Sequence, residues 1–171
     1  MLRAPLRGLL VQLSRGAEAA KLLATVPKSA NRDEEGERLL LIGLAWSDAR
    51  HLDAAEKAFN DAKRAGADAD LVDSGIATLR VQAGKLDEAE ALLRAVLRRS
   101  PQLSGALYNL AVVRVRRGDL AEAAGLIRQS WAMGLQDAHQ LKHDPDLKEL
   151  REEKGLIDDL MIEPIPRCRT W

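Results

Sequence analysis

Apolar residues recur at intervals of three and four along most of this chain. In the segment AGKLDEAEALLRAVLRRSP (83–101), the apolar positions are Leu86, Ala89, Leu92, Leu93, Val96 and Leu97. This spacing places them on one side of a helix, and Gly84 and Pro101 mark its two ends. The pattern predicts one amphipathic helix within this segment.

The same segment is one copy of a repeated unit. GKLDEA (84–89) returns as GDLAEA (118–123), and RHLDAA (50–55) lies one equal step before it. Successive copies are 34 residues apart, which indicates that one supersecondary unit is repeated along the chain. Because a single helix pair cannot bury its own apolar side, such units must stack, and at least three are expected.

Three units follow from this period: 36–69, 70–103 and 104–137. Their shared positions are Leu39, Ile42, Gly43, Trp46, Ala55, Phe59 and Ala62 in the first unit; Ile76, Ala77, Gly84, Ala89, Leu93 and Pro101 in the second; and Leu107, Leu110, Ala111, Gly118, Ala123 and Ile127 in the third. This pattern resembles the tetratricopeptide repeat (TPR) family, whose 34-residue unit is a pair of antiparallel helices. The resemblance implies an all-α fold, an α-solenoid of antiparallel helix pairs with a TPR-like superhelix. The chain departs from the family pattern where Arg80 and Arg114 replace an aromatic residue.

Small residues explain the pattern physically. Helix axes approach closely only over small side chains, so we expect Gly43 and Ala77 to face the alanines of the partner helices. Gly84 and Gly118 permit a left-handed turn between the helices of a unit, and Pro101 ends a second helix.

The two ends of the chain fit the repeat less well. Residues 1–35 are predicted to be an N-terminal helical cap or a degenerate repeat. Residues 138–162 are predicted to form C-terminal capping helices, with Asp144 as N-cap and Pro145 in the first helical position. Residues 163–171 are predicted to be a tail.

Composition and charge narrow the class of protein. The 171 residues include 26 basic and 26 acidic side chains, so no net field attracts nucleic acid. Cys168 is the only cysteine, which excludes an intramolecular disulfide. These features favour a cytoplasmic protein. Residues 1–15 are basic and rich in leucine, and the alternative is that they target the chain to an organelle or a membrane surface.

The sequence carries no recognisable catalytic chemistry. It has no phosphate-binding loop, dinucleotide fingerprint or nucleophile elbow, so we expect no enzyme and no cofactor. His139 and His143 have helical spacing but no further strong ligand motif, so we expect no metal site. An arginine-rich stretch is interpreted as solvated surface, which makes nucleic acid an unlikely partner; its members are Arg94, Arg98, Arg99, Arg114, Arg116 and Arg117.

The family resemblance implies that the first helix of each unit lines a concave groove. At the family's groove positions this chain has Leu40, Leu44, Ser47, Asp48, Ser74, Thr78, Val81, Gln82, Tyr108, Asn109, Val112, Val115 and Arg116. A groove of this composition suits an apolar peptide or an amphipathic helix. We therefore expect a protein-interaction adaptor that binds a protein or peptide partner. The alternative function is an assembly factor that uses the basic N-terminal segment for targeting or anchoring. The oligomeric state and the partner's identity stay open.

Overall fold

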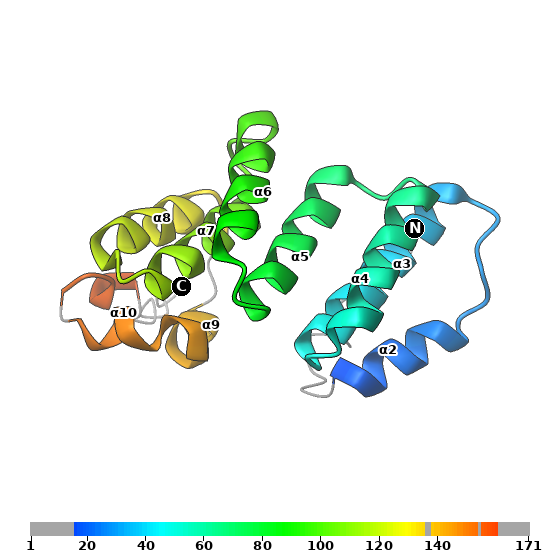
Figure 1. Ribbon diagram of the computed structural model, residues 1–171, viewed down its shortest axis with the longest axis horizontal. Helices are drawn as coiled ribbons and strands as arrows, with labels where there is room; N and C mark the ends of the chain where they lie inside the picture. The colour runs from blue at the N-terminus through cyan, green and yellow to red at the C-terminus, as the bar shows by residue number, and fades with distance from the viewer. Residues whose placement is uncertain (1–15, 136–137, 154, 161–171) are drawn as a thin grey trace, which may run out of the picture. The chain divides into compact units, whose positions relative to one another are not determined.

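The computed structural model describes residues 16–135, 138–153 and 155–160, and the regular structure within these ranges is entirely helical (Figure 1). The chain divides into two compact units, Met1–Ser100 and Pro101–Trp171, and each is described by itself. The predicted all-α fold of consecutive antiparallel helix pairs is confirmed. No helix in the described part of the chain is both long and apolar enough to cross a membrane.

The first unit contains two successive helix pairs preceded by one further helix. Its elements are α2 (Gly16–Thr25), α3 (Arg32–Asp48), α4 (Leu52–Ala65), α5 (Ala69–Gln82) and α6 (Leu86–Arg99). Helix α3 packs against α4, α5 packs against α6, and α4 also contacts α5. The turns between these helices are only a few residues long, so neighbouring helices run antiparallel (Figure 1).

Local sequence sets the helix boundaries. The Asn31 side chain accepts a hydrogen bond from the backbone N–H of Asp33 (2.9 Å) and so caps α3. The Asp68 carboxylate caps α5 in the same way, accepting from the Asp70 N–H (2.8 Å). Gly84, in the turn between α5 and α6, has φ +76°, as predicted from its place between the helices of a unit.

The core of the first unit is centred on Phe59, which is fully buried in α4. A Cβ atom on Gly43 would lie 2.6 Å from the Phe59 ring, and so would one on Gly75 of α5. Two glycines on two neighbouring helices therefore make room for one ring. The sequence prediction placed an alanine of the partner helix opposite Gly43, and the structure adds that the atoms nearest to a Cβ there belong to Phe59.

Helix α2 packs against α3 through its buried residues Ala19, Ala20 and Leu23. The buried Arg38 of α3 donates from Nη1 to the Leu23 carbonyl (3.0 Å) and pairs with Glu35 (2.7 Å). Arg38 thus adds a second donor to a carbonyl group at the end of α2, which also accepts from the Val26 N–H (3.3 Å). The leucine-rich residues 1–15 lie outside the described part of the chain, so the predicted N-terminal cap stays a prediction.

The second unit begins with the helix pair α7 (Ser104–Arg116) and α8 (Leu120–Ala132). Gly118, with φ +82°, forms the predicted left-handed turn between them. Buried side chains from both helices form the core of the pair, among them Ala111, Val113 and Ile127. Ser130 adds a polar contact, donating from its hydroxyl to the Ser104 carbonyl (2.9 Å).

A run of short helices follows this pair in the second unit. It comprises α9 (Ala138–His143), η1 (Pro145–Leu147), α10 (Lys148–Glu152) and η2 (Asp158–Leu160). Asp144 caps η1, accepting from the Asp146 N–H (2.8 Å), and Pro145 occupies the first helical position, as predicted. Leu147, Leu150 and Ile157 are fully buried, and η1 contacts α7 while α10 contacts α8. The predicted tail, residues 163–171, lies outside the described part.

Candidate partner-binding face

The predicted partner face of the first unit lies on α3 and α5, the first helices of their pairs. Eight of the thirteen predicted residues belong to it, four on each helix, at positions 34 residues apart: Leu40 and Ser74, Leu44 and Thr78, Ser47 and Val81, Asp48 and Gln82. The two helices are joined by the Gln82 amide, which donates from Nε2 to the Ser47 hydroxyl (3.3 Å) and lies within reach of the Ser47 carbonyl (3.4 Å). The structure therefore brings the α3 and α5 positions together.

These eight residues differ in how far solvent reaches them. Leu40, Ser47, Ser74 and Val81 are buried, and Thr78 and Gln82 are half-buried. The two exposed members are Leu44, whose exposed fraction is 42%, and Asp48, one helical turn further along α3. An exposed leucine beside an exposed carboxylate is thus the accessible part of the α3 positions.

Leu71 of α5 extends this face and was missing from the sequence prediction. Its exposed fraction is 39%, and it lies two helical turns before Thr78, on the same side of α5. Its seven-residue spacing from Thr78 was the available signal in the sequence. We call the exposed and half-buried residues Leu44, Asp48, Leu71, Thr78 and Gln82 the α3–α5 face.

Asp48 is the charged member of the α3–α5 face and has an unfavourable electrostatic environment. It is the last residue of α3, where the negative end of the helix dipole disfavours a second negative charge. The start of α2 lies against the base of its side chain, since a Cβ atom on Gly16 would come 3.1 Å from Asp48 Cβ. Desolvation raises the pKa of the Asp48 carboxyl above its ordinary value, and within the described residues no cation forms an ion pair with it.

The remaining five predicted residues lie on α7 in the second unit, and two of them, Tyr108 and Arg116, contact the chain's own segment 144–146. The Tyr108 hydroxyl donates to the Asp144 carboxylate, and Arg116 pairs with Asp146 (2.5 Å). Burial, together with the Asp144 carboxylate, raises the pKa of the Tyr108 phenol. Val112 and Val115 are buried, Asn109 is half-buried, and Arg116 is exposed.

Arg151 of α10 fixes the η1 segment from the other side. Its Nη1 donates to the Asp144 carbonyl (2.6 Å) and to the Leu141 carbonyl (3.0 Å). The α7 positions that match the groove of the family pattern therefore already contact an acidic segment of the same chain. The sequence signal for this contact was the Asp-Pro-Asp-Leu run itself, which was interpreted as a helix start within the C-terminal cap and not as a contact with the groove positions.

Comparison with known proteins agrees with the repeat geometry. Residues 75–131 match the sequence model of the tetratricopeptide repeat family. This third of the chain therefore carries tetratricopeptide repeat sequence. Comparison with curated protein sequences finds no match.

Solved structures with a similar fold include two of MamA. The "MamA RS-1 ArsTM double mutant" is 15% identical, with a TM-score of 0.53, over 91% of this chain and 92% of that one. MamA 41-end from Desulfovibrio magneticus RS-1 is also 15% identical, with a TM-score of 0.51, over 91% of each chain. At this identity the likeness concerns the fold. The TPR match of residues 75–131 supports a protein-interaction scaffold in general.

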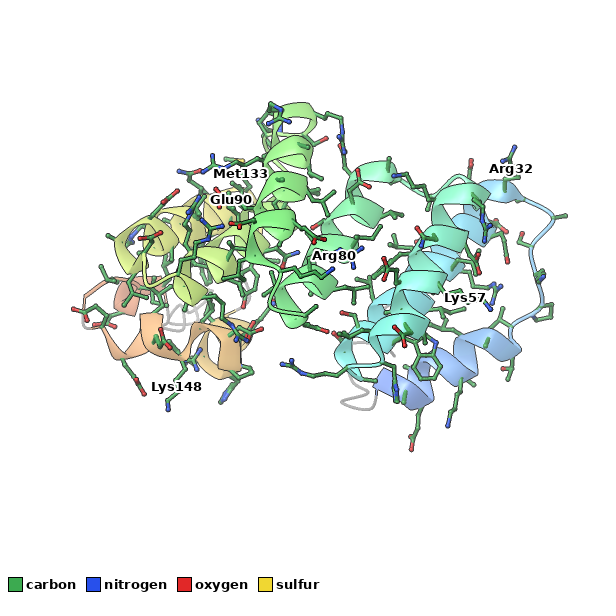
Figure 2. The ribbon with its side chains drawn as sticks, viewed as in Figure 1. Arg32, Lys57, Arg80, Glu90, Met133 and Lys148 are labelled. Carbon is green, nitrogen blue, oxygen red and sulfur yellow. The ribbon has the colours of Figure 1, made fainter. Side chains whose placement is uncertain are left out.

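Two arginines replace the aromatic residue of the TPR pattern, and both form ion pairs at the same register. Arg80 pairs through Nε with Glu88 (3.1 Å), and Arg114 pairs through Nε with Glu122 (3.1 Å), one repeat later. Arg80 also reaches Glu56 of the preceding pair (2.6 Å), and Figure 2 shows its side chain extending from α5. A charged contact between the two helices of a repeat thus takes the place of an aromatic one.

The interpretation of the arginine-rich stretch as solvated surface is wrong for Arg114, which is buried. Its side chain packs within the repeat while its charge meets Glu122. The others are exposed: Arg94 pairs with Glu90 (2.7 Å), and Arg99 pairs with Asp70 (2.6 Å). Acidic side chains therefore neutralise much of the stretch.

Nothing in the described residues of this protein forms a metal site. No group of three or more histidine, cysteine, aspartate or glutamate side chains there is arranged to hold an ion. The side chain of His139 and the whole of Cys168 lie outside the described part.

Proposed function

We propose that this TPR protein is an adaptor whose α3–α5 face binds an apolar peptide or an amphipathic helix of a partner protein. The observation that supports this most directly is Leu44, which is 42% exposed on a helix whose other leucines are largely buried. Burying the exposed part of a leucine contributes about 1 kcal/mol, since the whole side chain contributes roughly 2 kcal/mol. Leu44 and Leu71 together supply apolar contacts on both helices of the face.

Binding on this face requires little rearrangement. The backbones of α3 and α5 are fixed by packing onto α4 and by the bond from Gln82 to Ser47. A rigid surface loses little conformational entropy when a partner docks, so more of the contact free energy appears as affinity. The proposed mechanism is shape complementarity without a chemical step, in keeping with the TPR family, whose members are typically non-catalytic.

The test is selection of random peptides from a display library on the full-length chain. We expect the wild-type protein to enrich binders and Leu44→Asp to lose them, because a charge replaces the apolar contact. Leu22→Asp is the matched control, since Leu22 is also exposed (48%) but lies on α2, outside the face. Far-UV circular dichroism and urea unfolding check that both variants stay folded.

Two results would reject this proposal. One is that the wild-type chain enriches no peptide. The other is that Leu44→Asp and Leu22→Asp retain the same binders as the wild type. The alternative function, targeting or anchoring by the basic N-terminal segment, concerns residues 1–15 and stays a prediction about a part of the chain that the structure does not describe.

A further inference from the structure

One register position of the first helix differs in its bonding among the three repeats. It is Asp48 in α3, Gln82 in α5 and Arg116 in α7, each 34 residues from the next. Gln82 bonds to Ser47, and Arg116 pairs with Asp146, so in these two repeats the position has a partner within the chain. Within the described residues, Asp48 has no such partner.

The negative charge of Asp48 disfavours the folded state. It ends α3, where a cation is preferred, and the nearby Arg50 forms no ion pair with it. Residues that break a local rule without a structural benefit tend to lie at functional sites. Its position one turn from the exposed Leu44 places it on the α3–α5 face.

The second unit shows how a segment contacts this register position. Arg116 of α7 takes the Asp146 carboxylate of η1, and the next residue of that segment, Leu147, is fully buried. The short η1 segment thus supplies both a charge that pairs with the register position and, at the next residue, a buried apolar side chain. In α3 the residue at this register position is Asp48, so the required charge is reversed, and the exposed Leu44 lies one helical turn before it.

We propose that the partner segment carries a lysine or arginine that pairs with Asp48, next to an apolar residue that packs on Leu44. This inference rests on the proposed function and adds the chemistry of the ligand. The cation removes the unfavourable interaction between the Asp48 carboxylate and the C-terminal end of α3. The same residue therefore contributes to affinity and determines specificity, because an acidic segment would meet repulsion there.

The test compares peptides selected from one random display library by the full-length wild type, by Asp48→Lys and by Asp48→Asn. Asn60→Lys is the control for Asp48→Asn, since each substitution raises the net charge by one and Asn60 is exposed on α4, outside the α3–α5 face. We expect wild type and Asn60→Lys to enrich segments that pair a basic with an apolar residue. Asp48→Asn is expected to bind these about tenfold more weakly, the loss expected for one partly desolvated charge pair. Asp48→Lys is expected to enrich acidic segments instead.

The outcomes separate this inference from the proposed function. One outcome is that the wild type and Asp48→Lys both enrich apolar peptides of the same charge. In that case the face binds peptides, but the inference is overturned. If no peptide is enriched at all, the proposed function fails with it. Selected peptides that reproduce residues 2–13, or a dimer in light scattering that Asp48→Lys dissociates, would assign the face to this chain itself and also overturn the inference.

Discussion

Phe59 of α4 occupies space that only a glycine at position 43 leaves open. A Cβ atom on Gly43 would lie 2.6 Å from Phe59 Cδ1, a distance that real side chains do not adopt. In the next two repeats, the equivalent pairs are Ala77 with Leu93 and Ala111 with Ile127. Among the three repeats, the one with the largest side chain at this position of the second helix also has the smallest residue at the paired position of the first helix.

Gly43→Ala is expected to destabilise the protein by about 1–3 kcal/mol, because the new methyl group overpacks a fully buried ring. An alanine in a helix interior ordinarily gains about 1 kcal/mol over glycine, so the sign of the effect is informative. Urea unfolding followed by far-UV circular dichroism measures it. A stabilised Gly43→Ala variant would contradict the packing.

Phe59→Leu should rescue Gly43→Ala, because the second repeat already uses the Ala–Leu combination. We expect the double variant to be more stable than the sum of the single effects by about 1 kcal/mol. Additive single effects would show that the two residues do not interact. The measurement is a double-mutant cycle from the same urea unfolding curves.

Tyr108 gives a direct spectroscopic test of the contact with η1, because it is the only tyrosine in the chain. Burial and the Asp144 carboxylate favour the neutral phenol, so the folded protein should show no tyrosinate absorbance at the ordinary pKa of about 10. The unfolded chain loses this proton near pH 10, so stability should fall as the pH rises above that value. Tyrosinate formation near pH 10, while circular dichroism still shows folded protein, would contradict the buried contact.

Arg50 occupies a left-handed conformation, with φ +58°, at the register where the other two repeats have Gly84 and Gly118. A non-glycine residue in this region costs about 1 kcal/mol. Arg50→Gly should therefore raise the free energy of unfolding by about that amount, with Arg50→Ala as a control that keeps the strain. Equal melting temperatures for the glycine and alanine variants would show that backbone strain is not the cause.

Asp48→Asn should stabilise the protein at neutral pH while weakening peptide capture. The pKa of Asp48 is raised in the folded state, so its ionised form destabilises the fold above that pKa, and the penalty disappears as the carboxyl becomes protonated. The stabilisation by Asp48→Asn should therefore shrink as the pH falls toward and through the raised pKa. Thermal unfolding at several pH values measures this trend, and a gain that grows on acidification would refute it.

The repeat architecture could be read from the sequence because it depends on local and periodic features. A period of 34 residues, turn glycines at 84 and 118 and the Asp144–Pro145 helix start each act over a few neighbouring residues. Local backbone preference and helical periodicity determine such features, so they can be predicted without knowledge of the tertiary structure. The candidate face was partly predictable for the same reason, since its register follows from the period.

Contacts between distant residues were decided only by the tertiary structure. The 34-residue period of the sequence predicted the class of fold and the helix pairs, and the family resemblance supplied all positions of the face except Leu71. It did not show that Phe59 needs two glycines, that Arg114 is buried against Glu122, or that Asp144 and Asp146 contact α7. These depend on which side chains meet after the helices pack, where the available volume and the nearest opposite charge select the partner. For the same reason, only the packed structure distinguishes Asp48, which forms no ion pair with any residue that the structure describes, from Arg116, which pairs with Asp146.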